Sequence, residues 1–290
     1  MTKAFQLSAS EWVSGGSHID TSSGRIFYRE EGDGPVLVML HGFPTWSYDW
    51  AKVAPALACH HRVITLDFPG YGFSDKRRGV DFSVAGSADA VEQLLAHLGI
   101  SRAALVIHDY GGIVGQELLD RHRRARLSFA VDAVHVLNSG IVYSAYRPTR
   151  VQKLLAKPIL GALVASRLNK EKLHPGLNSV RGTNKLGDSE FDELWVGMSR
   201  DNGHKLAHRH IRYNAERAVH HQRWEEALFG YEGPLQLIWG LADPVSGRHV
   251  LDLARPRLPT ARIVELEQVG HFPQSEAPAQ VAAAIRGEGT

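Results

Sequence analysis

The stretch LVIHDYGGIVG, residues 105–115, decides the fold that the rest of the chain must fit. Its first half is a continuous apolar run, as is usual for a strand buried on both faces of a parallel sheet. Asp109 ends the run, and Gly111 and Gly112 open a stretch with helical spacing. The sequence therefore predicts a strand, a sharp turn that carries an aspartate, and a helix. An aspartate at such a place is also a common helix N-cap, so the turn alone assigns it no chemical role.

Strand-like and helical segments alternate on both sides of this turn. Strands are predicted within residues 25–32, 36–42, 62–75, 103–109, 129–139, 235–245 and 261–272. Helices are predicted at 47–58, 83–98, 111–122, 247–256 and from Pro278 onward. This alternation predicts an α/β fold, with a doubly wound, mostly parallel sheet and helices on both faces.

Residues 140–224 interrupt the alternation, because they show helical periodicity and many charges but no convincing strand. A helical insertion between two strands of a parallel sheet predicts a cap over the carboxyl ends of the strands, where such sheets bind ligands. We therefore expect a core of residues 1–139 and 225–290 and a helical cap of residues 140–224.

Composition and charge argue against several classes of function. The 290 residues are 43% hydrophobic and 22% charged, which suits a globular enzyme. The net charge of +2 gives no indication of nucleic acid or an acidic membrane surface as a partner. No run approaches the roughly 18 apolar residues of a membrane span, and the N-terminus lacks the apolar segment of a signal peptide. With its single cysteine, Cys59, the chain is expected in the reducing cytoplasm.

Sixteen histidines raise the question of a metal site. The groups His60–His61, His208 with His210, and His220–His221 are not joined by cysteines or a carboxylate at ligand spacing. We expect neither a metal nor a cofactor.

Three polar residues stand at the carboxyl ends of predicted strands. Asp109 ends one strand, Asp243 follows LIWGLA, and His271 follows VELEQVG. Because the carboxyl ends of parallel strands meet at one edge of a sheet, we expect these side chains to converge. Asp243 would orient and stabilise His271, and His271 would act as a base. The order of nucleophile, acid and histidine along the chain is that of the α/β-hydrolase fold.

The motifs together resemble the aspartate-nucleophile branch of the α/β-hydrolase superfamily, which includes epoxide hydrolases and haloalkane dehalogenases. They are HGFP (41–44), DFPGYGFSD (67–75), HDYGG (108–112), Asp243 and His271. Within that branch the chain most resembles the mesoderm-specific transcript proteins, in HGFPTWSYDW, VITLDFPGYGFSDK, HDYGGIVGQELL and LNSGIVYSAYRPTRVQKLL. The resemblance spans residues 24–276 and is weakest in the predicted cap. Ile107 departs from it, because turns of this kind carry a small residue two positions before the nucleophile.

The resemblance implies a reaction in two steps. The Asp109 carboxylate displaces a leaving group from an sp3 carbon and forms an alkyl ester. Water activated by His271, with Asp243 behind it, then hydrolyses the ester. The backbone N–H groups of Phe43 and Tyr110 would form the oxyanion hole for that second step. The wall of the substrate pocket is expected to include His41, Pro44, Trp46 and His108.

An epoxide opens to an alkoxide, which must receive a proton. In epoxide hydrolases two cap tyrosines supply it, and Tyr213 matches the second by its place ahead of Asp243. Tyr143 and Tyr146 are the candidates for the first, and both lie nearer the nucleophile than the family pattern. The sequence leaves the choice between them open. We predict an epoxide hydrolase that converts apolar epoxides to vicinal diols with water as the second substrate.

Two other functions stay open. A haloalkane dehalogenase would use the same Asp109, Asp243 and His271, and VIHD and PTWSYDW resemble those enzymes. Against this reading, Tyr110 stands where dehalogenases typically carry Trp, and Phe43 stands where many carry Asn. A fold retained only for binding is the third possibility, although the full set of candidate catalytic residues argues against it.

Overall fold

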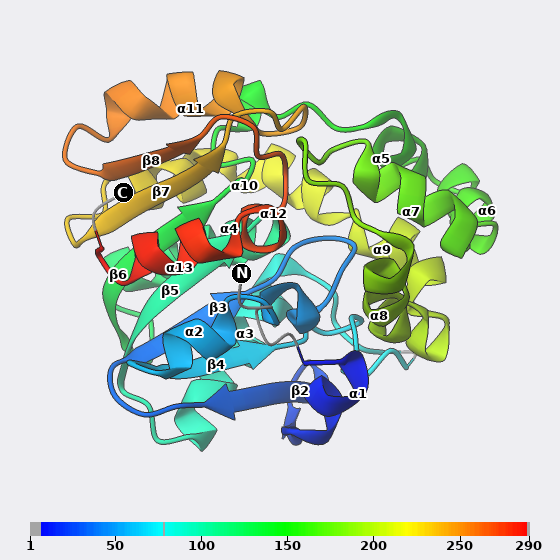
Figure 1. The fold of residues 1–290 in the computed structure, drawn as a ribbon. Helices are drawn as coiled ribbons and strands as arrows, with labels where there is room; N and C mark the ends of the chain where they lie inside the picture. Colours follow the sequence, from blue (N-terminus) through cyan, green and yellow to red (C-terminus); the bar gives the residue numbers. More distant parts are fainter. Residues whose placement is uncertain (1–6, 78, 289–290) are drawn as a thin grey trace.

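An eight-stranded sheet forms the centre of the computed structural model, which describes residues 7–77 and 79–288 (Figure 1). Its strands are β1 (Gly16–Thr21), β2 (Gly24–Glu31), β3 (Val36–Leu40), β4 (Arg62–Leu66), β5 (Arg102–His108), β6 (Ala130–Leu137), β7 (Leu235–Gly240) and β8 (Arg262–Leu266). They lie in the order β1-β2-β4-β3-β5-β6-β7-β8. Strands β3 to β8 run parallel, whereas β2 pairs antiparallel with β1 and β4. The predicted α/β fold with a mostly parallel sheet is confirmed.

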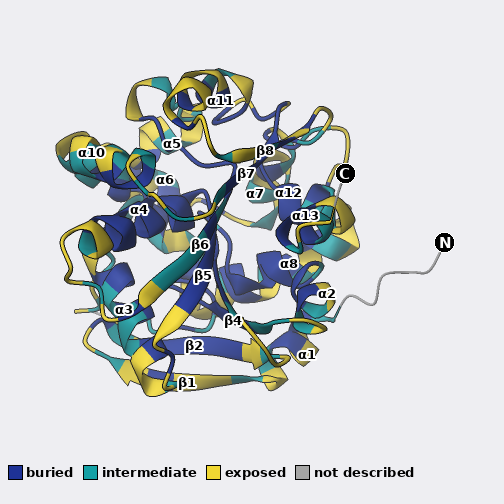
Figure 2. Ribbon diagram, turned by 90° about the vertical axis from the view of Figure 1, so that its left-hand side faces the viewer, coloured by how far each residue is buried: buried dark blue, intermediate teal, exposed yellow. Residues whose placement is uncertain are grey.

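Helices cover both faces of the sheet (Figure 2). One layer holds α3 (Val84–His97), α4 (Tyr110–Arg123), α10 (Tyr213–Phe229), α11 (Arg248–Ala254) and the short η4 (Arg255–Arg257). The other holds α1 (Ala9–Ser14), η1 (Ser47–Trp50), α2 (Ala54–Ala58), α12 (Pro273–Glu276) and α13 (Pro278–Ile285). The central strand serves both layers because its side chains alternate: Leu105 and Ile107 join the first core, and Ala104 and Val106 the second.

Between β6 and β7 the described chain is helical. It runs through η2 (Tyr143–Ala145), α5 (Arg150–Leu155), α6 (Leu160–Ser166), α7 (Lys170–Asn178), α8 (Asp188–Ser199), η3 (Arg200–Leu206) and α9 (Ala207–His210). The carboxyl end of β6 leads directly into this segment, and Figure 1 shows α5 to α9 gathered on one side of the sheet. The predicted end of the cap at residue 224 falls inside α10, which packs against α4. Within the described ranges, no helix has the length and apolarity needed to cross a membrane.

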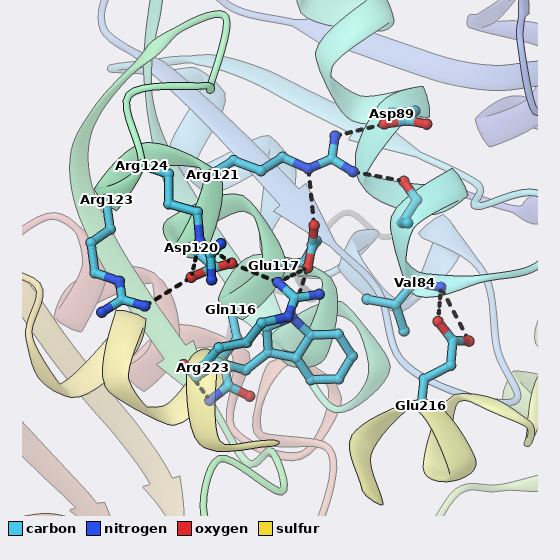
Figure 3. A network of polar contacts seen from close by, with 12 residues as sticks. Val84, Asp89, Gln116, Glu117, Asp120, Arg121, Arg123, Arg124, Glu216 and Arg223 are labelled. Atoms are coloured by element: carbon cyan, nitrogen blue, oxygen red, sulfur yellow. Dashed lines mark hydrogen bonds and ion pairs between the residues drawn. The ribbon is translucent and has the colours of Figure 1, made fainter. Parts of the chain in front are cut away.

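A network of charged side chains ties α10 to α4 (Figure 3). Arg223 of α10 lies 2.6 Å from carboxylate oxygens of both Glu117 and Asp120 of α4. The indole N–H of Trp224 donates to Glu117 at 2.7 Å, and Arg121 extends the network to acidic residues of α3. Because the two carboxylates of α4 are buried, their cationic partners compensate the loss of hydration. The network therefore fixes the position of α10, whose first residue lies at the candidate site.

Candidate functional site

Asp109 occupies the sharp turn between β5 and α4. Its backbone has φ 46° and ψ −111°, a conformation that L-residues rarely adopt. Although Asp109 directly precedes the helix, its side chain makes no capping hydrogen bond to it. Instead, Oδ1 accepts a hydrogen bond from the N–H of Phe43 at 2.8 Å, and Oδ2 lies 3.5 Å from Nε2 of His271. The carboxylate is thus directed toward the other candidate residues and not toward its own helix.

Glycines provide the space that this turn requires. A Cβ at Gly111 would lie 2.3 Å from the carbonyl oxygen of Leu40 in β3, so only glycine lets the helix start so close to the sheet. Ile107, which departs from the small residue of the family pattern, packs against Gly115 of α4. A Cβ at Gly115 would lie 2.8 Å from Cδ1 of Ile107. The glycine in the helix therefore supplies the space that a small residue in the strand would otherwise give.

His271 and Asp243 form a close imidazole–carboxylate pair. Nδ1 of His271 lies 2.7 Å from Oδ2 of Asp243. The same oxygen accepts hydrogen bonds from Asn138 Nδ2 at 3.0 Å and Ser246 Oγ at 2.8 Å, while Oδ1 accepts a backbone N–H. These donors fix the carboxylate in one orientation, and the carboxylate in turn holds the imidazole so that Nε2 faces Asp109.

Burial and pairing set the charges of these three groups. Burial alone would raise the pKa of Asp243, but the charge and hydrogen bond of His271 lower this pKa to about 2. Burial also opposes ionisation of Asp109, and His271 again outweighs it and lowers the pKa of that carboxyl. Burial disfavours the imidazolium of His271, yet the two carboxylates raise its pKa well above the usual value. The resting site therefore holds an imidazolium between two carboxylates.

Two further histidines lie beneath the site and are neutral. Burial lowers the pKa of His108 to about 4; its Nε2 donates to the carbonyl oxygen of His271 at 2.7 Å, and its Nδ1 accepts from Gln274 at 3.1 Å. Burial also lowers the pKa of His41, whose Nε2 accepts the N–H of Phe68 at 3.1 Å. The hydrogen-bond partners assign the tautomer of each ring. Both rings hold backbone segments in place.

Tyr146 and Tyr213 place two buried hydroxyls near Asp109. Tyr213 is the first residue of α10, and its ring centroid lies 5.1 Å from that of Tyr110. Burial and the charge of Asp109 raise the pKa of Tyr146 to about 12. Burial, the neighbouring Tyr146 and Asp109 raise the pKa of Tyr213 as well. The two hydroxyls interact with each other, and that of Tyr146 also interacts with Asn214. Among the described residues, neither forms a hydrogen bond of normal geometry, so each can turn to a bound molecule.

Tyr143, the other candidate for the first cap tyrosine, lies at the surface. Its side chain is 36% exposed, and its ring stacks on His221 with the centroids 4.5 Å apart. His221 lies about two helical turns along α10 from Tyr213. Of the two candidates, only Tyr146 is placed beside Tyr213, and this placement argues against the expected role of Tyr143.

Backbone amides of Phe43 and Tyr110 adjoin the carboxylate. The Phe43 N–H already donates to Oδ1 of Asp109. The Tyr110 N–H is the first amide of α4, and it donates to no other residue in the described part of the chain. The Tyr110 side chain is directed elsewhere, because its hydroxyl lies 2.7 Å from Oγ of Ser87.

A cavity of about 590 Å³ connects the cap with this site. Phe43, Pro44 and His271 contribute to its wall, whereas Asp109, which contacts Phe43 and His271, does not line it. The remaining wall is largely apolar and includes Val151, Leu155, Val164, Leu168, Leu173, Leu177, Val180 and Met198.

Of the four residues expected in the pocket wall, Pro44 lines the cavity and three do not. The three that do not are His41, His108 and Trp46, which are fully buried. Each forms a hydrogen bond with a backbone group. The indole N–H of Trp46 donates to the carbonyl of Leu194 in α8 at 2.9 Å. Expecting these three in the wall is therefore wrong, because their side chains are buried and hydrogen-bonded within the protein.

Several residues at the site escaped the sequence analysis. Asn138 bonds Asp243, and its neighbour Ser139 donates from Oγ to the carbonyl oxygen of Asp109 at 2.8 Å. Both follow directly after the apolar run of β6, the strand that lies between β5 and β7. Two adjacent polar residues at the end of a buried strand are the sequence feature from which a role at the site could have been predicted. Gln274 lies in the short helix α12 and gives no comparable signal.

Comparison with known proteins first identifies the class. Residues 35–278 match the family described by the alpha/beta hydrolase fold, so the chain belongs to the α/β-hydrolase family. It is 36% identical to the mesoderm-specific transcript homolog protein of Homo sapiens, over 92% of this chain and 83% of that protein. It is 34% identical to the putative hydrolase LipZ of Mycobacterium tuberculosis, over 96% of both chains. The predicted resemblance to the mesoderm-specific transcript proteins is confirmed.

Solved structures share the fold. The haloalkane dehalogenase DbeA from Bradyrhizobium elkani superposes with a TM-score of 0.76 at 22% identity, covering 94% of this chain and 96% of that one. The epoxide hydrolase CorEH superposes with a TM-score of 0.74 at 20% identity, covering 93% and 96%. At these identities the likeness concerns the fold, and it does not distinguish the two chemistries.

Proposed function

We propose that this hydrolase is an epoxide hydrolase, which adds water to an oxirane and releases a vicinal diol. The observation that carries the proposal is the pair of buried hydroxyls of Tyr146 and Tyr213, which lie next to each other and near Asp109. A halide leaves as a stable anion, whereas an opened epoxide is an alkoxide that must be protonated. A tyrosine with a raised pKa keeps its proton until a strong base forms beside it, and an alkoxide is such a base.

The first step is attack of Oδ2 of Asp109 on an epoxide carbon. The new bond joins Oδ2 to carbon, the ring C–O bond breaks, and its electron pair goes to the ring oxygen. A hydroxyl of Tyr146 or Tyr213 gives that oxygen a proton, and the imidazolium of His271 returns a proton to the tyrosinate through water. The products of this step are an alkyl ester on Asp109, a neutral His271 and a restored tyrosine.

The second step is hydrolysis of the ester. Nε2 of His271 takes a proton from water, and the resulting hydroxide attacks the carbonyl carbon of the ester, which is Cγ of Asp109. Negative charge develops on Oδ1, where the Phe43 N–H already donates at 2.8 Å and the Tyr110 N–H is available. The intermediate then expels the diol oxygen, which takes the proton of the new carboxyl group. Asp109 is a carboxylate again, and His271 is an imidazolium as at the start.

The substrate reaches Asp109 from the cavity. The cavity ends at Phe43 and His271, so side chains next to Asp109 would have to move for a substrate to reach the carboxylate. The largely apolar wall suits a substrate whose bulk is hydrocarbon. A cap of residues 140–224 would then select the substrate, while the core performs the reaction.

A haloalkane dehalogenase is the second candidate, since Asp109, Asp243 and His271 serve both reactions and DbeA shares the fold. The halide would need its own donors. Tyr110 offers no ring N–H and is bonded to Ser87, and the indole of Trp46 is bonded to Leu194. These placements favour the epoxide.

Product analysis tests the proposal. The purified chain is incubated with styrene oxide and, separately, with 1,2-dibromoethane, and the diol and free bromide are measured. We expect diol from the epoxide and no bromide. Bromide without diol would assign the dehalogenase reaction instead, and the absence of both products would contradict both enzymatic readings.

A further inference from the structure

The cap carries an exposed apolar surface, of which only Val151 also lines the cavity proposed for the substrate. It lies on α5, on α6 and on the turn between them, and the two helices pack side by side (Figure 1). Its exposed side chains are Val151, Leu154, Ile159, Leu160 and Leu163, which we call the hairpin surface. Elsewhere in the described chain, the large exposed hydrophobic side chains are scattered: Tyr143, Val196, Val219 and Leu253. A cluster of this kind usually marks a site of interaction.

The backbone holds the apolar side chains outward. Val151 and Leu154 are one helical turn apart, and so are Leu160 and Leu163, so each short helix presents a stripe. Ile159 precedes α6 with φ 61° and is 91% exposed. A β-branched residue rarely adopts this conformation, and burial of the side chain within the chain does not offset its conformational cost. The turn therefore displays Ile159 at the tip of the hairpin.

Exposed basic side chains are interspersed with the apolar ones along this segment. Those exposed between residues 147 and 172 are Arg147, Arg150, Lys153, Lys157, Arg167 and Lys172. None of the six forms an ion pair with a carboxylate in the described ranges, and Glu171 is the only acidic residue in this segment. By contrast, exposed arginines of the core, such as Arg102 and Arg255, are paired with acids. The local charge is therefore strongly positive, although the net charge of the whole chain is only +2.

The hairpin surface adjoins the mouth of the cavity. Arg150, Val151 and Arg167 are exposed and also line the cavity wall. Leu154, Ile159 and Leu163 are exposed but do not line it. The cavity and the hairpin surface thus share Val151, and unpaired basic side chains of the same segment also line the cavity.

We propose that the hairpin surface docks on a lipid bilayer that contains anionic lipids. The apolar side chains would enter the boundary of the acyl chains, and the unpaired cations would contact the headgroups. A second copy related by a two-fold axis would bring the same unpaired cations together, which disfavours a dimer through this face. Docking would set the cavity mouth against the membrane, where apolar molecules concentrate. Only this delivery of substrate depends on the proposed function; the docking itself does not.

Vesicle co-sedimentation of the full chain tests the docking. We expect binding to vesicles of phosphatidylcholine with phosphatidylserine, and at least about tenfold weaker binding to phosphatidylcholine alone or at high salt. The double variants Ile159→Asp/Leu163→Asp and Lys153→Ala/Lys157→Ala should each lower binding to the anionic vesicles about tenfold or more. Leu253→Asp is the matched control, because Leu253 is exposed on α11 of the core and should leave binding unchanged.

The variants carry changes only at exposed side chains, so their thermal unfolding should match that of the parent chain. Their hydrolysis of a water-soluble epoxide should also be unchanged, which separates failure of docking from failure of the reaction. The proposal is overturned if the parent chain does not bind the anionic vesicles, or if both double variants bind as well as it does. A dimer of the parent chain that Ile159→Asp/Leu163→Asp converts to a monomer would likewise overturn it, because a second copy would then cover the surface.

Discussion

Nε2 of His271 lies 3.5 Å from Oδ2 of Asp109, while Nδ1 of the same ring lies 2.7 Å from Oδ2 of Asp243. The imidazolium is therefore stabilised by two carboxylates at once. Formation of an ester would remove the charge of Asp109 and leave Asp243 as the single anionic partner. The pKa of His271 would then fall at the step in which a neutral base is required, so the first reaction prepares the second.

The pKa of His271 should accordingly fall when Asp109 loses its charge. A carboxylate within about 4–6 Å raises the pKa of a neighbouring cation by about 1–3 units, so Asp109→Asn should lower the pKa of His271 by that order. NMR titration of the imidazole in both chains measures the difference. In single-turnover experiments, ester hydrolysis should rise with pH through a midpoint below the pKa of the free chain. Equal pKa values in the two chains would contradict the coupling.

The hydroxyls of Tyr146 and Tyr213 should matter for ring opening and little for stability. Tyr146→Phe and Tyr213→Phe should each slow formation of the ester from an epoxide by about 10²-fold, because each removes a proton donor. Neither hydroxyl forms a hydrogen bond of normal geometry among the described residues, so unfolding temperatures should change little. Tyr143→Phe is the matched control and should react at the parent rate. An unchanged rate of ester formation in both Tyr146→Phe and Tyr213→Phe would show that these hydroxyls take no part in the reaction.

Gly115 should be intolerant of a side chain because of Ile107. Gly115→Ala places a Cβ 2.8 Å from Cδ1 of Ile107 and should lower the free energy of unfolding by about 1–3 kcal/mol. The effect should be smaller in an Ile107→Ala background, as a double-mutant cycle measured by urea denaturation would show. Gly176→Ala in α7 is the control, because a Cβ there meets no atom within 4 Å. Equal costs in both backgrounds would mean that Ile107 and Gly115 do not compensate each other.

Asp120 should stabilise the fold in a pH-dependent way. Burial opposes its ionisation, but Arg223, Arg123 and Arg124 outweigh burial and lower its pKa. A carboxyl whose pKa is lowered by folding stabilises the chain above its unfolded pKa of about 4, and that contribution disappears as the pH falls through the folded pKa. Asp120→Asn should therefore lower the urea midpoint near neutral pH and have a much smaller effect in acid.

Asp252→Asn is the control for this comparison, because Asp252 is exposed and has no ion pair among the described residues. It should leave the urea midpoint unchanged at either pH. If Asp120→Asn lowers the urea midpoint equally at neutral and acid pH, packing and not the ion pairs accounts for the decrease.

The predicted strands of the core agree with the structure because buried parallel strands have a simple signature. VLVML and AALVI are continuous apolar runs, and each becomes a central strand. Strand β1, GSHIDT, was not predicted, because it lies at the edge of the sheet and buries only Ile19. A sequence with one buried side chain in six residues carries too little periodicity to distinguish a strand from a loop.

The functional site, too, could be predicted from the sequence only in part. Strand ends placed Asp109, Asp243 and His271 at one edge, and the structure brings them within hydrogen-bonding or ionic distance. The choice between Tyr143 and Tyr146 could not be made, because distance along a loop does not tell where a ring points. The excess of positive charge beside the hairpin surface was also not predicted. A net charge summed over the whole chain cancels such a local excess against acidic residues elsewhere.

The measurement that tests the central claim most directly is the mass of the chain after exposure to an epoxide. His271→Gln keeps a polar side chain but removes the base, so one round of esterification should occur without hydrolysis. Incubated with styrene oxide, this variant should gain the mass of one substrate molecule, located on the peptide that contains Asp109. The added mass should be absent from Asp109→Asn/His271→Gln. An unmodified His271→Gln at saturating epoxide, beside a parent chain that forms diol, would contradict the covalent mechanism.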